Sequence, residues 1–255
     1  MESTNWRYDT ARDSGLSFVD RLKECPCEPD PFVYSARFAA ALAIRAALRI
    51  YNRLDIVGRQ HLPREGSFVL VANHASHLDA VALLSALPLR SLNRAYPLAA
   101  RDYFEANELR FAITAIVANV MLLDRNSKSV EGLKLCQRIL EEPGNVLVMF
   151  PEGTRSTDDR VGMFRRGVGL LLAGAPYPVV PCYLDGAGRA WSKGTLLPRP
   201  TRVRLAIGES RTYERVERSD AGALHICAAL RGAVLALASE TWPQTTQPIS
   251  QEAYQ

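Results

Sequence analysis

Short apolar runs that alternate with helical patterns restrict the fold of this chain more than any other feature. The run over residues 67–72 is rich in β-branched residues and follows a glycine, which is typical of a fully buried strand. Further strands are predicted over residues 55–58, 95–100, 117–123, 145–150, 179–184 and 202–207. Helices are predicted over residues 78–87, 103–116, 127–142 and 221–241. Because strands alternate with helices, we expect a single α/β domain over residues 55–241, with a mainly parallel central sheet flanked by helices.

The segments outside this domain differ from it in composition. Residues 1–29 are polar without a sustained period, and residues 242–255 form a second polar tail. Residues 30–54 are predicted to form a basic amphipathic helix, with one face that carries Arg37, Arg45, Arg49 and Arg53. Its charge-free stretches are far shorter than the ~20 apolar residues of a spanning helix, so it should not cross a bilayer. It is either a membrane anchor that lies in the interface or a helix packed on the core with its arginines in water.

Composition restricts the partners and cofactors. A chain of 255 residues, 47% of them hydrophobic, suits one globular domain with a large core. The formal net charge of +4 is modest and predicts no nucleic-acid partner. The five cysteines are scattered in a sequence without a secretory signal, so we expect free thiols in a reducing cytoplasm. Cys25 and Cys27 could begin a metal site, but no second close cysteine pair completes it, and no metal is predicted.

A cluster of polar residues, at positions 73–79, follows the buried run over residues 67–72. His74 and Asp79 are five positions apart, so a turn from strand into helix can bring the carboxylate back to the imidazole. A carboxylate that holds one ring N–H leaves the other nitrogen able to take a proton from a substrate hydroxyl. A structural interpretation also fits, because Ser76 and Asp79 have the spacing of a capping box. Both roles remain open and can coexist.

The loop over residues 150–156 has the composition of an anion-binding loop. Gly153 permits a sharp turn, Thr154 offers a hydroxyl, and Arg155 carries a guanidinium fork suited to a phosphate. The alternative is a plain turn in which Arg155 meets only Glu152 or solvent. In a parallel sheet this loop and the polar cluster at residues 73–79 lie at the same edge, beyond the carboxyl ends of the strands, where active sites commonly lie.

Two motifs resemble those of a known enzyme family. Residues 73–79 read N-H-A-S-H-L-D and resemble the N-H-x-S-x-x-D signature of the glycerolipid acyltransferases typified by 1-acylglycerol-3-phosphate acyltransferase. Residues 150–156 match the F-P-E-G-T-R-S block of that family. Similar flanking segments lie at residues 123–125, 164–167 and 179–184, so the resemblance covers about residues 55–210.

The resemblance implies an acyltransferase of phospholipid biosynthesis whose donor is a thioester, acyl-CoA or acyl carrier protein. The acceptor would be the hydroxyl of a lysoglycerophospholipid such as 1-acylglycerol-3-phosphate, at the cytoplasmic face of the cell membrane, with the enzyme bound peripherally. His74 would be the general base and Asp79 its orienting partner. Substrate contacts would come from Asn73, Ser76, Arg101, Arg125, Glu152, Gly153, Thr154 and Arg155. No cofactor or metal is implied, because a thioester is already activated.

Three other interpretations remain open. The acceptor could be another lyso-lipid, such as a lyso-ornithine lipid, and Arg101 stands where many members of the family have lysine. An esterase or thioesterase could use Ser76, His74 and Asp79, although Ser76 lacks the G-x-S-x-G elbow. A catalytically idle membrane-binding protein is the third, and the intact His74, Asp79 and Arg155 count against it.

Overall fold

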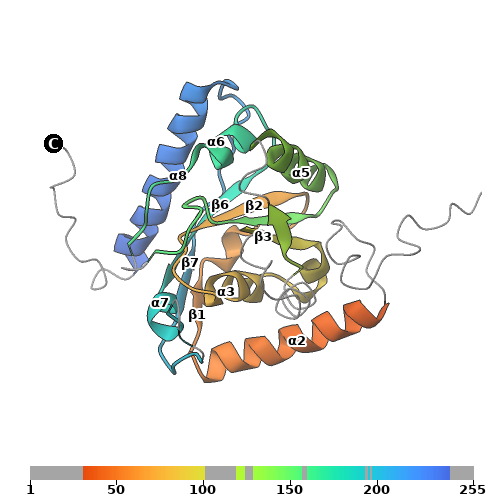
Figure 1. Cartoon of the computed structure of the whole chain (residues 1–255), viewed down its shortest axis with the longest axis vertical. Coiled ribbons are helices and arrows are strands. Elements are labelled where there is room, and N and C mark those ends of the chain that lie inside the picture. The colour runs from red at the N-terminus through yellow and green to blue at the C-terminus, as the bar shows by residue number, and fades with distance from the viewer. Residues whose placement is uncertain are drawn as a thin grey trace, which may run out of the picture.

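A central sheet organises the molecule (Figure 1). The computed structural model describes residues 31–100, 119–123, 129–156, 160–192, 195 and 197–241. Over these residues the sheet has seven strands in the order β1-β7-β6-β2-β5-β3-β4. Their bounds are β1 Asp55–Val57, β2 Phe68–Ala72, β3 Ala95–Ala100, β4 Met121–Leu123, β5 Val146–Met149, β6 Val179–Asp185 and β7 Arg204–Ile207.

The direction of the strands brings the predicted motifs together. Neighbouring strands are parallel at every described pairing except that of β6 with β7, which is antiparallel. The prediction of a single α/β domain with a mainly parallel sheet is therefore confirmed. Because β2 pairs directly with β5 and both run the same way, the loops that follow them are neighbours at one edge of the sheet.

Helices cover both faces of the sheet (Figure 1). One face carries α2 (Pro31–Ile50), α3 (Leu78–Ala86) and α7 (Ala187–Ala190), and the other carries α5 (Ser129–Glu141), α6 (Arg166–Leu172) and α8 (Asp220–Thr241). The connections include the 3-10 helices η1 (Arg59–His61) and η2 (Leu89–Arg94).

The central strand β2 shows why a continuous apolar run is needed. Phe68, Leu70 and Ala72 enter the core beneath α3, whereas Val69 and Val71 enter the core on the opposite face. Every one of them is at most 5% exposed. A parallel strand that is covered on both faces has no solvent side on which polar residues could alternate.

The apolar helix α8 belongs to the core. Among the described residues it is the one helix whose length and composition would allow it to cross a membrane. It packs along α6 and β6 and contributes buried side chains at Ala223, Ile226, Cys227, Leu230, Ala233, Val234 and Ala238. This agrees with the prediction of a helix over residues 221–241 that packs on the sheet.

Most other predicted elements lie within two residues of the observed bounds. The strand predicted over residues 117–123 is an exception, because β4 begins at Met121. Asn119 has a left-handed φ of 50°, which extended backbone does not permit, so pairing starts beyond it. The helix predicted over residues 103–116 lies outside the described residues.

The orientation of α2 corrects the prediction made for the first helix. The helix ends at Ile50, and Arg37 is only 2% exposed and donates a hydrogen bond to Asn93 Oδ1 at 3.0 Å. Arg45 also points inward, where it donates to the carbonyl oxygens of Leu84, at 3.2 Å, and Leu87. For Arg37 and Arg45 the expectation of a face toward water or a membrane is wrong, whereas Arg49 and Arg53 are exposed. The carbonyl oxygen of Leu84 also accepts the backbone N–H of Leu87 at 3.3 Å, and the guanidinium of Arg45 supplies further donors to the end of α3.

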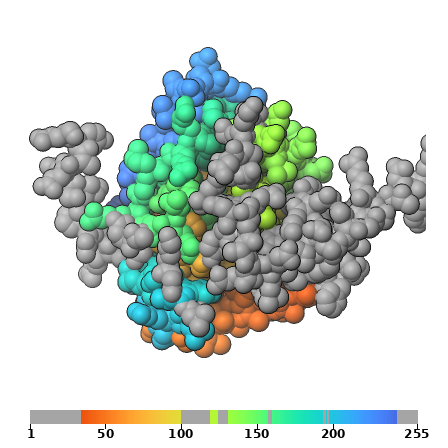
Figure 2. All heavy atoms as spheres, viewed as in Figure 1, coloured from red at the N-terminus to blue at the C-terminus, as the bar shows by residue number. Residues whose placement is uncertain are grey.

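The outward face of α2 is apolar instead. Four large side chains are between 41% and 80% exposed, namely Tyr34, Phe38, Leu42 and Ile50. Alanines at positions 39, 43, 46 and 47 are exposed between them. In Figure 2 the spheres of α2 form one border of the molecule, beside those of α7. A continuous row of exposed apolar side chains on the surface of a folded protein marks a contact site more often than a single scattered apolar residue does.

Candidate active site

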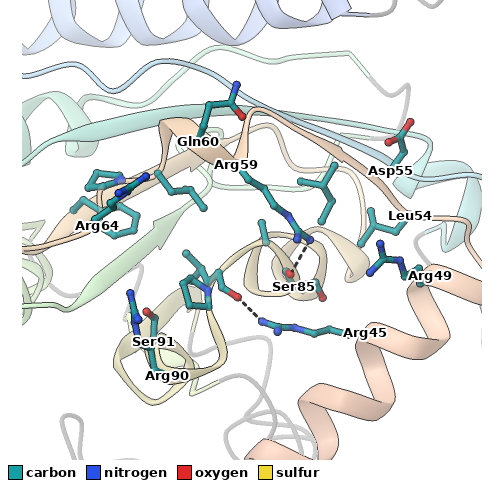
Figure 3. A pocket seen from close by; sticks show the side chains of 17 residues that line it. Arg45, Arg49, Leu54, Asp55, Arg59, Gln60, Arg64, Ser85, Arg90 and Ser91 are labelled. Atoms are coloured by element: carbon teal, nitrogen blue, oxygen red, sulfur yellow. Dashed lines mark hydrogen bonds between the residues drawn. The ribbon is translucent and has the colours of Figure 1, made fainter.

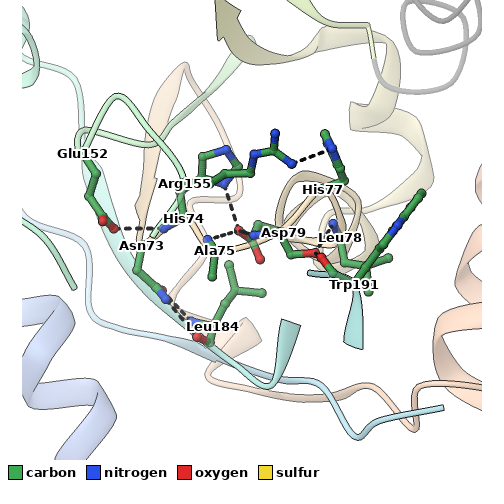
Figure 4. Close-up of polar contacts among 11 residues, drawn as sticks. Asn73, His74, Ala75, His77, Leu78, Asp79, Glu152, Arg155, Leu184 and Trp191 are labelled. Carbon is green, nitrogen blue, oxygen red and sulfur yellow. Dashed lines mark hydrogen bonds and ion pairs between the residues drawn. The ribbon is translucent and has the colours of Figure 1, made fainter. Parts of the chain in front are cut away.

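Main-chain contacts lock the two predicted motifs together (Figure 4). The backbone N–H of His74 donates to Glu152 Oε1 at 2.9 Å, and the backbone N–H of Ser156 donates to the carbonyl oxygen of His74 at 2.7 Å. The loop after β2 and the loop after β5 therefore form one unit. Its position follows from the neighbouring, parallel course of these two strands.

His74 is held as a proton acceptor. Its Nδ1 lies 2.9 Å from Asp79 Oδ2, and its ring stacks on Phe150 with 4.2 Å between ring centroids. The side chain of Asp79 is 1% exposed and that of His74 is 23% exposed. Nε2 has no hydrogen-bond partner among the described residues. A carboxylate on Nδ1 fixes the tautomer in which Nε2 carries the free lone pair, so Nε2 can accept a proton from a substrate hydroxyl.

Asp79 also closes the start of α3. Its Oδ2 accepts the backbone N–H groups of Ala75 at 2.7 Å and Ser76 at 2.8 Å. The Oγ of Ser76 in turn accepts the backbone N–H of Leu78 at 3.2 Å. The capping interaction and the contact to His74 therefore coexist on one carboxylate oxygen. The other oxygen, Oδ1, is buried and has no hydrogen-bond partner in the described part of the chain.

Asn73 and Ser76, two predicted substrate contacts, bond to the protein's own backbone. Asn73 is 3% exposed, and its amide donates to the carbonyl of Leu184 at 2.9 Å and accepts the N–H of the same residue at 2.8 Å. The hydroxyl of Ser76 is directed at the carbonyl oxygen of Trp191, 2.8 Å away. These contacts tie the loop after β2 to β6 and α7. Ser76 is fully buried and makes no bond to His74, which disfavours it as a nucleophile.

Glu152 and Gly153 shape the second loop. Glu152 is 9% exposed, and its two carboxylate oxygens accept the backbone N–H groups of His74 at 2.9 Å and Gly162 at 3.1 Å. Burial raises the pKa of this carboxyl, while the two N–H donors oppose the rise. Gly153 has a φ of 73°, and a Cβ there would lie 2.6 Å from Arg165 Nε. The positive φ favours glycine at this turn, and a side chain there would have to displace Arg165, whose Nε donates to the carbonyl oxygen of Glu152 at 3.1 Å.

Arg155 reaches across to the first loop. Its Nη1 lies 2.6 Å from His77 Nε2, and the His77 ring meets the Trp191 ring edge-on at 5.6 Å between centroids. Thr154 is exposed. Arg155, from the loop after β5, is thus held against a histidine of the loop after β2 that was not among the predicted site residues. The predicted contacts Arg101 and Arg125 lie outside the described residues.

Two features of the site could not be predicted from local sequence patterns. They are the presence of Trp191 and the contact between His77 and Arg155. Both partners of that pair lie in the recognised motifs, but they are 78 positions apart. Trp191 joins the site only because α7 follows β6, the other neighbour of β2.

The class of protein follows from this fold and from the match of its sequence to a family. Residues 53–185, which contain both loops, match the Acyltransferase family. The match spans just over half of the chain, and the chain belongs to that family.

Relatives within the family have a common name. The chain is 30% identical over 158 residues to the 1-acyl-sn-glycerol-3-phosphate acyltransferase of Limnanthes alba, a match that covers 59% of this chain and 51% of the relative. It is 32% identical over 137 residues to the human 1-acyl-sn-glycerol-3-phosphate acyltransferase alpha, covering 52% of this chain and 46% of the relative. The chain therefore spans about half the length of the curated relatives it matches.

A solved structure shares the fold. The crystal structure of PlsC, the 1-acyl-sn-glycerophosphate (LPA) acyltransferase from Thermotoga maritima, superposes with a TM-score of 0.61. The match covers 82% of this chain and 81% of that one at 20% sequence identity. At this identity the likeness supports the architecture and not the substrate.

Proposed function

We propose that this chain transfers an acyl group from a thioester carrier to the hydroxyl of a lysoglycerophospholipid such as 1-acylglycerol-3-phosphate. The observation that carries the proposal is the His74–Asp79 pair, joined at 2.9 Å, with a free Nε2 beside the loop that holds Arg155. The names of the relatives support this choice of acceptor. The donor is a thioester of coenzyme A or acyl carrier protein.

The reaction needs one base and good positioning. His74 Nε2 takes the proton of the acceptor hydroxyl as its oxygen attacks the thioester carbonyl carbon. The new C–O ester bond forms, the C–S bond breaks, and the proton returns from the imidazolium to the thiolate of the carrier. Asp79 stabilises the imidazolium between these two proton transfers. No covalent acyl-enzyme is required, in agreement with the buried position of Ser76.

Product analysis tests the reaction and its acceptor. Purified protein would be offered a panel of lyso-acceptors, including lyso-ornithine lipid, with acyl-CoA and acyl carrier protein in separate reactions. Mass spectrometry should detect the diacyl ester of a phosphate-bearing acceptor. Free fatty acid in place of the ester would identify a hydrolase and reject the proposal.

Arg155 is assigned to the acceptor phosphate. Arg155→Ala is expected to raise KM for 1-acylglycerol-3-phosphate about tenfold or more and to leave KM for the thioester nearly unchanged, because a charge-assisted contact to one substrate is lost. Steady-state kinetics in both substrates measure this. Arg155→Lys keeps the charge but not the planar fork, so part of the effect should remain. An equal rise in both KM values would contradict the assignment.

We further propose that the protein binds peripherally to the cytoplasmic face of the cell membrane through the outward face of α2. The acceptor and product are membrane lipids, so the active site must work close to a bilayer. Phe38, Leu42 and Ile50 supply apolar area that is exposed in the described structure. An amphipathic helix of this kind lies in the interface plane and binds reversibly.

The apolar face makes this membrane contact testable. Phe38→Gln combined with Leu42→Gln should weaken binding to phospholipid vesicles about tenfold or more, because full burial of a large apolar side chain contributes about 1.5–3 kcal/mol and about half of each of these two is already covered by the protein. Vesicle co-sedimentation at low and high ionic strength measures the change. Leu224→Gln on α8 is a matched control, since Leu224 is 54% exposed on another helix. If the double variant pellets like the wild type, the contact lies elsewhere.

A further inference from the structure

A cavity lies at the end of α3 that is far from the catalytic pair (Figure 3). It has a volume of about 660 Å³ and is lined by α2, by the segment between β1 and β2, and by the last turn of α3. Asp79 lies in the first turn of α3, whereas Ser85 and Leu87 lie at the cavity. Nine helical residues span about 13 Å at ~1.5 Å each, so the cavity is separate from the catalytic edge.

The lining of this cavity is strongly basic. Five arginines contribute to it, namely Arg45, Arg49, Arg59, Arg64 and Arg90. Among the described residues of the lining, Asp55 is the one acidic residue, and its carboxylate is paired with Arg202 at 3.2 Å. Figure 3 shows the side chains of Arg45 and Arg49 coming from α2, with Arg64 and Arg90 across the cavity from Arg49.

Among the described residues, most of this positive charge has no anionic partner. Arg45 and Arg59 donate to carbonyl oxygens at the end of α3, which carry no full negative charge. Arg49, Arg64 and Arg90 make no side-chain hydrogen bond or ion pair with any residue in the described part of the chain. The Nε of Arg45 is buried and has no hydrogen-bond partner among the described residues. Burial and the nearby charge of Arg59 both lower the pKa of Arg45, which is the sign of an environment that lacks an anion.

We propose that this cavity binds the phosphate-bearing head group of an anionic phospholipid, at a site distinct from the acceptor site. Guanidinium forks pair with phosphate oxygens in a bidentate way, and several of them converge here. The volume is that of a small-molecule site, which leaves room for the rest of a head group.

The helix α2 indicates why the phosphate should belong to a lipid. Arg49 lines the cavity, and the adjacent Ile50 is 80% exposed on the apolar face. Acyl chains can therefore lie along Phe38 and Leu42 while the head group enters beside Arg49. The inference rests on the membrane contact proposed above and adds a selective lipid to it.

Two exposed arginines allow a clean test. Arg64→Gln combined with Arg90→Gln should preserve the fold, because neither side chain bonds to a described residue. Affinity for vesicles that contain phosphatidylglycerol should fall roughly thirty-fold, as expected for two arginines at an anionic surface, while binding to phosphatidylcholine vesicles stays unchanged. The charge-matched control is Arg138→Gln with Arg215→Gln, which removes two exposed arginines outside the cavity lining and should keep wild-type affinity.

Three outcomes decide the matter. Selective loss in the cavity variant supports the site. An equal loss in the control variant would overturn it, because general surface charge would then explain the binding. Unchanged vesicle binding together with loss of inorganic pyrophosphate binding would also overturn it, since the cavity would then take a free phosphate and not a lipid.

Acyl transfer to a detergent-dispersed acceptor separates this inference from the proposed function. Arg64 and Arg90 lie away from the catalytic edge, so the cavity variant should transfer acyl groups at the wild-type rate in detergent. If the cavity variant lost vesicle binding selectively but the wild-type protein formed no ester, the proposed function would be rejected and the lipid site would be retained.

Discussion

Replacing His74 with alanine should lower the rate of acyl transfer by about two to four orders of magnitude and leave the protein folded. The imidazole is the proton acceptor in the proposed reaction, and no described group makes a hydrogen bond to its Nε2. The fold should survive because main-chain atoms hold this loop, through the contacts of His74 with Glu152 at 2.9 Å and with Ser156 at 2.7 Å. Single-turnover transfer and thermal unfolding measure the two effects separately.

A histidine outside the site provides the control for this variant. His225 is exposed on α8, so His225→Ala should keep the wild-type rate and melting temperature. A His74→Ala protein that transfers acyl groups at a near wild-type rate would show that the acceptor hydroxyl loses its proton elsewhere. The general-base role would then have to be withdrawn.

The sheet and the two motif loops could be predicted because their signals are local. A strand covered on both faces must be continuously apolar, and β2 satisfies that rule at each of its five residues. Parallel strands direct their following loops to one edge, so the proximity of His74 and Arg155 follows from the order of elements. The antiparallel pairing of β7 with β6 has no comparable signal, because an apolar run does not record its direction.

The orientation of α2 could not be predicted for a related reason. Arginines four residues apart must share a helical face, but periodicity does not say whether that face meets water or protein. The answer depends on the carbonyls of Leu84 and Leu87, which lie 39 and 42 positions from Arg45. Arg37 and Arg45 turn inward, Arg49 and Arg53 stay exposed, and Phe38 and Leu42 lie outside. The sequence pattern alone therefore could not show which arginines of the predicted face are buried.

Spacing also could not choose between the two roles of Asp79, and the structure explains why. One oxygen, Oδ2, accepts the ring Nδ1–H of His74 and the backbone N–H groups of Ala75 and Ser76. The capping contacts place the carboxylate so that it meets the imidazole at 2.9 Å. The same carboxylate oxygen therefore caps α3 and orients His74. A substitution of Asp79 must affect both the stability of the helix start and the orientation of the imidazole, though not equally.

Asp79→Asn should accordingly reduce turnover by about a hundredfold or more and lower stability by about 1–3 kcal/mol. An amide oxygen in the place of Oδ2 can still accept the three N–H groups, but it has no charge to stabilise the imidazolium. Its NH₂ group then replaces Oδ1, which is buried without a partner, and the unmet donor destabilises the fold.

The matched variant for Asp79→Asn is Ser76→Ala, which removes a capping hydroxyl of the same helix start and leaves the carboxylate in place. Both variants should melt at lower temperature, by about 2–4 °C for each kcal/mol lost. Turnover per folded molecule should fall far more in Asp79→Asn, because only that variant removes the charge beside His74. If the folded fraction of Asp79→Asn turns over as fast as that of Ser76→Ala, the carboxylate only caps α3, and another group must stabilise the protonated histidine.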